Sequence, residues 1–212
     1  MRPTGLVTAF LVLIAGVGQA ADYRYDTSYS VSLGVLPIAR MTFETEVSGG
    51  RYTISGRFHS SSLIDIVREV SADSSVSGRM TGGVMRPERY VLGYKSGKRK
   101  HVYEVLFSEG NVVETRVTPE RPKPKSWVPV PAADLRAVFD PIGALLIPGD
   151  ADVCQQTLPV YDGESRMDLV LSPNRSERFS AGTAKWDAIV CSVRYVPKSG
   201  YRKGRKDIEY LK

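Results

Sequence analysis

The two cysteines and two histidines are the residues of this chain whose side chains could bind a metal or act in catalysis. Thiolates and imidazoles bind zinc when four ligands come together, and a thiolate beside an imidazole can act as a nucleophile. Cys154 and Cys191 are far from His59 and His101 in the sequence and share no metal-ligand spacing with them. The cysteines also lack the Cys-x-x-Cys spacing of redox motifs. The sequence therefore predicts no metal site and no cofactor.

Three neighbouring carboxylates, Asp162, Glu164 and Asp168, could form an acid–base group. Asp162 and Gly163, however, form a dipeptide that is typical of tight turns. The residues after this turn alternate between an apolar face and a more polar one, with Met167, Leu169 and Leu171 against Arg166, Asp168 and Val170. We interpret the segment as a β-hairpin in which Glu164 and Asp168 face solvent or pair with Arg166.

Motifs of the common hydrolase and nucleotide-binding classes are missing from the sequence. It contains no Gly-x-Ser-x-Gly elbow, no phosphate loop and no dinucleotide fingerprint. We therefore expect no enzymatic activity and assign no catalytic residue.

The N-terminal residues predict export. Leu6–Val17 is an apolar run that follows Arg2 and ends in Gly18-Gln19-Ala20, which is typical of a signal peptide over residues 1–20 with cleavage before Ala21. Cleavage before Asp22 is the alternative. A membrane anchor would need roughly 20 apolar residues, more than this run provides. We expect a periplasmic protein that does not span the membrane, with residues 21–212 forming one β-rich domain.

Export also gives the cysteines a structural role. An oxidising compartment allows disulfides to persist, so we expect a Cys154–Cys191 bond, with two free buried thiols as the alternative. The chain has 212 residues, of which 42% are hydrophobic, which is enough to bury a core. Its net charge of +6 indicates either attraction to anionic lipid headgroups or glycans, or ordinary solubility. Nucleic acid is not an expected partner outside the cytoplasm.

Most of the chain alternates with the period of two that is typical of half-buried strands. Turn residues such as Ser48-Gly49-Gly50, Ser96-Gly97 and Glu109-Gly110-Asn111 separate the alternating runs. The predicted strands cover residues 23–33, 41–47, 52–58, 74–81, 89–94, 101–107, 112–117 and 185–196, with a loop over 173–184. The sequence predicts an all-β fold, an antiparallel meander that forms a partly open barrel or β-spiral.

Short helices and a proline-rich connection interrupt this pattern. We expect one helix over residues 62–71 and helical segments over 132–139 and 140–146, the last capped by Asp140 with Pro141 at its first position. The proline-rich residues 118–131 predict an extended strap anchored by Trp127 and Val128, with a docking ligand as the alternative.

Two basic runs could bind anions. One is at a predicted hairpin turn (Lys95, Lys98, Arg99 and Lys100) and the other is in the C-terminal residues (Lys198, Arg202, Lys203, Arg205 and Lys206). Such runs are more often solvated than bound to a ligand, so we assign neither a site.

The order of these features resembles an exported protein family of Gram-negative bacteria that is catalogued as domain of unknown function thirty-one zero eight. The matching features are Gly34, Pro87 and Tyr90 in Met-Arg-Pro-Glu-Arg-Tyr, Asp140-Pro141 with Ala144-Leu145-Leu146, Cys154, Val160-Tyr161-Asp162-Gly163, Arg166-Met167-Asp168-Leu169, Cys191 and Gly200-Tyr201. The resemblance implies an all-β envelope protein without assigned activity, and it supplies no catalytic residues.

These observations favour a periplasmic structural or interaction protein that supports the integrity of the cell envelope, with an envelope protein or a lipid or amphiphile as its partner. The alternative is a carrier that binds a lipid or another amphiphile inside the barrel, because aromatic side chains recur on the inward face of the predicted strands.

Overall fold

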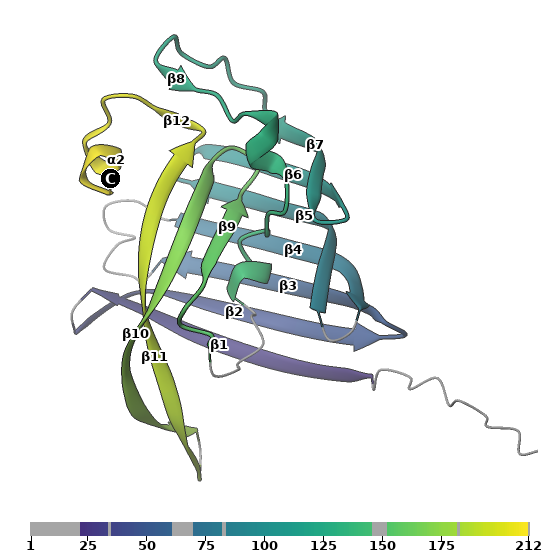
Figure 1. The fold of residues 1–212 in the computed structure, drawn as a ribbon, viewed down its shortest axis with the longest axis vertical. Coiled ribbons are helices and arrows are strands. Elements are labelled where there is room, and N and C mark those ends of the chain that lie inside the picture. The colour runs from purple at the N-terminus through teal and green to yellow at the C-terminus, as the bar shows by residue number, and fades with distance from the viewer. Residues whose placement is uncertain are drawn as a thin grey trace, which may run out of the picture.

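The computed structural model describes residues 22–33, 35–60, 70–81, 84–145, 152–181 and 183–211. Seven antiparallel strands form the main sheet, each hydrogen-bonded to the next in chain order (Figure 1). They are β1 (Tyr23–Leu33), β2 (Leu36–Ser48), β3 (Arg51–Ser60), β4 (Val70–Thr81), β5 (Val84–Ser96), β6 (Arg99–Ser108) and β7 (Asn111–Thr118). The predicted all-β meander is confirmed.

The pairing register explains why the alternating residues form a core. One row of paired residues crosses six strands on the same face, namely Tyr25, Thr45, Ile54, Val76, Tyr90 and Val105. The row is buried from β2 to β6, whereas Tyr25 on the edge strand β1 is 37% exposed. The core-side face is therefore covered over its centre and open towards β1.

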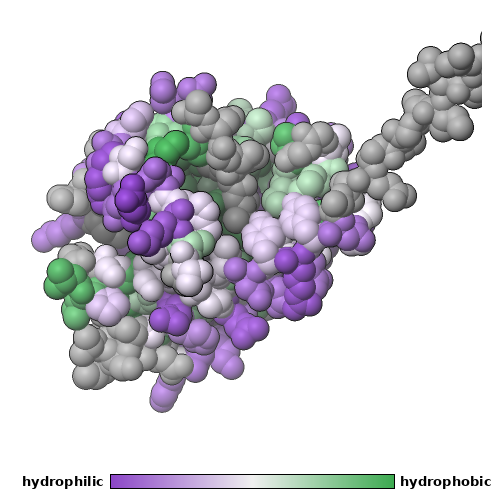
Figure 2. Space-filling view, turned by 90° about the horizontal axis from the view of Figure 1, so that it is seen from below, coloured by the Kyte–Doolittle hydropathy of each residue, from purple (hydrophilic) through white to green (hydrophobic). Residues whose placement is uncertain are grey.

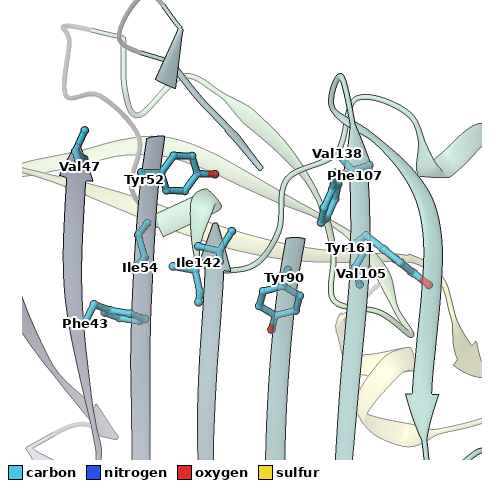
Figure 3. Close-up of a cluster of buried hydrophobic side chains, with 11 residues drawn as sticks. Phe43, Val47, Tyr52, Ile54, Tyr90, Val105, Phe107, Val138, Ile142 and Tyr161 are labelled. Atoms are coloured by element: carbon cyan, nitrogen blue, oxygen red, sulfur yellow. The ribbon is translucent and has the colours of Figure 1, made fainter. Parts of the chain in front are cut away.

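A second sheet passes across the core-side face of the first (Figure 1). It contains β9 (Thr157–Tyr161), β10 (Arg166–Ala181) and β11 (Ala184–Ser199) in the order β11-β10-β9. Tyr161 from this sheet, with Val138 and Ile142 from the preceding connection, packs into the main core (Figure 3). Among the described strands β1 and β7 are not paired with each other, so the fold is partly open.

The predicted helical segments are much shorter than expected. The predicted helix over 62–71 lies outside the described residues except for Val70 and Ser71, which begin β4. The segments predicted over 132–139 and 140–146 contain only the 3₁₀ turns η1 (Ala132–Leu135) and η2 (Gly143–Leu145).

Strand pairing is the reason why these segments do not extend into helices. Phe139 donates its N–H to the Pro159 carbonyl at 2.8 Å and accepts from the Tyr161 N–H at 3.0 Å. A backbone that pairs with β9 cannot also form the i to i+4 bonds of a helix. The predicted cap is present, since Asp140 Oδ1 accepts the N–H groups of Ile142 and Gly143, each at 2.9 Å.

The predicted loop over residues 173–184 was wrong, because these residues continue the two strands of a long hairpin. Pro173 lies opposite Cys191, and a bulge between Pro173 and Arg175 absorbs the irregularity. β9 pairs only with Arg166–Val170, so the missing N–H of Pro173 interrupts no pairing on that side of β10. Proline is tolerated at such an edge position, which the sequence pattern did not reveal.

The structure places the two cysteine sulfur atoms at bonding distance, with a Cα–Cα separation of 5.2 Å between Cys154 and Cys191. The bond links the long hairpin to the connection before β9. The predicted signal peptide lies outside the described residues. In the described part of the chain, no helix is long and apolar enough to cross a membrane.

Candidate functional site

The strap and the C-terminal residues, which the sequence treats as separate features, lie against each other. β8 (Trp127–Val128) in the strap pairs antiparallel with β12 (Tyr201–Arg202). The Gly200 N–H also donates to the Val128 carbonyl at 2.8 Å. After β12 the chain forms α2 (Lys206–Leu211), in which Ile208 is buried. The predicted C-terminal connection is thus an ordered part of the fold.

A cleft of about 470 Å³ lies between these two segments, and we call it the basic cleft. Four cationic side chains line it, two from the strap and two from the C-terminal residues: Arg121, Lys123, Arg202 and Arg205. Glu164 is the one acidic residue among the described residues that line it. Trp127 and Tyr201 add aromatic surface. The cleft therefore combines an excess of positive charge with flat apolar rings.

Glu164 fixes the two cations of the strap. Its carboxylate pairs with Lys123 Nζ, and its Oε2 lies 3.5 Å from a terminal nitrogen of Arg121. The same Arg121 nitrogen donates to the Tyr103 hydroxyl at 3.0 Å, and Lys123 Nζ lies 4.1 Å from the Trp127 ring centroid. Both cations are about two-fifths exposed, and such pairs contribute about 0–1 kcal/mol to stability. These contacts position the cations more than they stabilise the fold.

The turn that carries Glu164 is held by Asp162. Asp162 Oδ1 accepts the N–H groups of Glu164 at 2.8 Å and Ser165 at 2.6 Å. Burial raises the pKa of the Asp162 carboxyl, although these two hydrogen bonds act in the opposite direction. Gly200 packs against the turn so closely that a Cβ atom there would lie 2.1 Å from the Glu164 carbonyl oxygen. The base of the basic cleft is thus tightly packed.

The three neighbouring carboxylates do not form an acid–base group. Asp162 caps its own turn, and Glu164 faces the basic cleft. Asp168 pairs with Arg166 at 2.6 Å, as one of the two predicted alternatives states, and also lies 3.6 Å from Lys198 Nζ. Each carboxylate therefore has a separate structural environment.

The histidines are also separated. His59 on β3 is exposed, whereas His101 on β6 is buried on the core-side face. Burial, together with the nearby Arg121, lowers the pKa of His101. No group of three or more potential metal ligands occurs among the described residues.

Chemically, the basic cleft is suited to bind an anion. Guanidinium and ammonium groups donate charge-assisted hydrogen bonds to phosphate and carboxylate oxygens, and an indole face packs against an apolar or sugar moiety. Sequence reasoning missed this site because its two basic segments are almost 80 residues apart. The signal was present in each segment as cations interspersed with prolines or tyrosine, but only the β8–β12 pairing brings the segments together.

Comparison with known proteins gives a family and no function. No curated protein and no solved structure matches this chain. One family model matches residues 28–212, which include every described element from the middle of β1 onwards. The chain therefore belongs to the family described as "Protein of unknown function (DUF3108)".

Proposed function

We propose that this protein is a periplasmic interaction module that helps to maintain the cell envelope, and that its basic cleft binds a phosphate-bearing envelope anion. The observation that carries the proposal is the convergence of Arg121, Lys123, Arg202 and Arg205 on one cleft. The predicted signal peptide over residues 1–20 supports the compartment, and the net charge of +6, which becomes +5 when Arg2 is removed with that peptide, supports the sign of the ligand.

The architecture of the cleft supports binding rather than simple solvation of charge. Glu164 neutralises part of the charge of the strap and holds Lys123 beside the Trp127 ring. Arg202 makes no ion pair with the residues that the structure describes and lines the opposite side. A phosphate between the two sides would accept hydrogen bonds from both, and its attached group would lie against Trp127.

Tryptophan fluorescence provides a test in solution. The chain has two tryptophans, so Trp186→Phe leaves Trp127 as the only indole. We expect dihexanoyl phosphatidylglycerol, below its micelle concentration, to change Trp127 emission saturably, and dihexanoyl phosphatidylcholine to bind more weakly. Arg121→Ala with Arg202→Ala should weaken binding at least tenfold, roughly 1.4 kcal/mol or more. Arg57→Ala, an exposed cation on the far face of β3, is the matched control and should leave affinity unchanged. Equal affinity of the cleft variant and the control would contradict the proposal.

A test in cells addresses the envelope role. Deletion of the gene should sensitise the source bacterium to detergents and to antibiotics that the outer membrane excludes. The wild-type gene should restore resistance, whereas a gene encoding Arg121→Ala and Arg202→Ala should not. Normal growth of the deletion strain under these challenges would refute the envelope role.

A second candidate function is a carrier of an amphiphile, and one observation favours it. Tyr23, Tyr25 and Tyr29 lie on the core-side face of β1 and are 37–41% exposed. Aromatic side chains at the open edge of a sheet could contact an acyl chain or a ring. Organic extraction of protein purified from its native compartment tests this function. If no amphiphile is extracted and fluorescent lipid probes do not bind, the carrier function fails.

A further inference from the structure

The distal part of the β10–β11 hairpin is a ribbon only two strands wide. β9 pairs with β10 no further than Val170, while β10 and β11 stay paired up to Ala181 and Ala184. In Figure 1 this part of the hairpin projects past β1, away from β9 and the strap. From Cys191 to Ala184 the ribbon extends roughly 25 Å at about 3.3 Å per residue. A two-stranded ribbon of this kind is marginally stable unless something supports it.

Both faces of the ribbon are largely exposed, and its two largest apolar side chains lie near its end. Phe179 pairs with Trp186 across the two strands, and their rings stack with centroids 6.1 Å apart. Both side chains are more than half exposed, Phe179 at 56% and Trp186 at 54%. Ala188 follows Trp186 on the same face, because alternate residues of a strand share a face. The opposite face carries Arg178 and Asp187 and also Ile189, which is 59% exposed.

Most charges near the aromatic pair are compensated within the ribbon. Arg175 pairs with Glu177 at 2.7 Å, and Arg178 lies 3.6 Å from Asp187. Lys185 precedes Trp186 in the strand and therefore projects from the opposite face, and it has no acidic partner among the residues that the structure describes. The end of the ribbon thus presents two aromatic rings and one uncompensated positive charge.

The base of the ribbon is fixed to the body of the protein. Cys191 lies opposite Pro173 on the hairpin, and its disulfide partner Cys154 is buried. Natural proteins usually protect long exposed strands with charges, prolines or covering segments. Here the exposed end carries phenylalanine and tryptophan, which indicates a surface that contacts a partner.

We propose that the end of the β10–β11 hairpin, through Phe179, Trp186 and Lys185, inserts into the headgroup region of an anionic lipid bilayer. Tryptophan and phenylalanine are favoured at the membrane–water interface, and adjacent lysine is attracted to anionic headgroups. The net charge of +6 acts in the same direction. A second copy of the chain is a poorer occupant, because a stable interface needs about 800 Å² per partner and the end of this ribbon offers two large side chains. Figure 2, which views the end at which the hairpin projects, shows hydrophobic side chains interspersed with hydrophilic ones over this surface.

Vesicle binding tests this inference separately from the basic cleft. Trp127→Phe leaves Trp186 as the only indole, so its emission reports the hairpin alone. With vesicles of phosphatidylcholine and phosphatidylglycerol the emission should shift to shorter wavelength, and lipids brominated near the headgroup should quench it. Pure phosphatidylcholine vesicles should give a weaker effect. An unchanged spectrum with the anionic vesicles would overturn the proposal.

Variants identify the surface that binds. Phe179→Ser with Trp186→Ser should weaken co-sedimentation with anionic vesicles at least tenfold, while Val113→Ser, which removes another exposed apolar side chain, should not. Full binding by the hairpin variant together with loss of binding by Arg121→Ala with Arg202→Ala would assign the membrane contact to the cleft and overturn the hairpin proposal.

Sedimentation velocity without vesicles tests whether a second copy of the chain binds the end of the hairpin. A dimer that the hairpin variant abolishes would show that a second copy binds there instead. The cleft proposal does not depend on any of these outcomes.

Discussion

Asp140 is a carboxyl group placed in the middle of an apolar core. It is fully buried, and its Oδ2 has no hydrogen-bond partner among the described residues. Desolvation raises the pKa of Asp140 to about 6, although the N–H groups of Gly143 and Ile142 favour the ionised form. The sequence predicted the capping role of this residue from the Asp-Pro pair, but its burial depends on the fold around it.

The ionisation of Asp140 should therefore oppose folding at neutral pH. From about pH 4 to about pH 6 the folded chain keeps this proton while the unfolded chain loses it, so the free energy of unfolding should fall as pH rises and then level off. The shift corresponds to about 3 kcal/mol. Asp140→Asn keeps the oxygen that caps the turn and removes the titration. Denaturant unfolding of both proteins from pH 4 to 7 measures the effect. Identical pH slopes in the two proteins would rule out this role.

Gly200 shows how a single missing side chain shapes the basic cleft. Its φ is +78°, and a Cβ atom there would overlap the Glu164 backbone. Gly204 has a similar φ of +76° but open space around it.

These two glycines form a matched pair for mutation. Both Gly200→Ala and Gly204→Ala introduce the strain of a positive φ. Only Gly200→Ala also introduces a steric clash, so it should lower the free energy of unfolding by about 1–3 kcal/mol more than Gly204→Ala, as measured by urea denaturation. It should also weaken anion binding, because the clash displaces the turn that carries Glu164. Equal losses of stability would mean that the neighbouring backbone accommodates the methyl group.

Among the elements, the strands were predictable and the connections less so. Alternation of apolar residues predicted the strands of the main sheet, because only one face of each strand is buried. The residues over 173–184 carry no such alternation, since both faces of that ribbon are largely exposed. The apolar residues that predicted helices near 132–146 serve to pack the core instead. Pairing of Phe139 with β9 prevents this segment from forming helices.

The disulfide should support the hairpin as an element. A cross-link between residues 37 apart contributes about 4 kcal/mol in the chain-entropy model. Cys154→Ser with Cys191→Ser should lower stability by about this amount and accelerate amide hydrogen exchange in the distal β10–β11 ribbon more than in the centre of β3 and β4. Hydrogen exchange would be measured by mass spectrometry at denaturant concentrations that give both proteins the same free energy of unfolding. This separates the local effect on the ribbon from the global loss of stability. A uniform change across all strands would show that the bond has no specific effect on the hairpin.

For the whole molecule, the sequence predicted the class of fold but not the site. The basic cleft needs residues from the strap, the hairpin turn and the C-terminal segment, and no local pattern reports that these meet. The cations of the strap and those of the C-terminal residues, viewed separately, are indistinguishable from a solvated surface. The tertiary pairing of β8 with β12 converts them into two sides of one cleft.

NMR chemical-shift mapping would show whether the basic cleft binds a phosphate-bearing anion, because it locates the ligand as well as detecting it. Isotope-labelled protein would be titrated with dihexanoyl phosphatidylglycerol below its micelle concentration. We expect saturable shifts confined to residues 121–127, the Glu164 turn and residues 199–208, and their loss in Arg121→Ala with Arg202→Ala. Shifts centred on the tyrosines of β1 would favour the carrier function instead. The absence of saturable shifts at the basic cleft would show that it does not bind this anion.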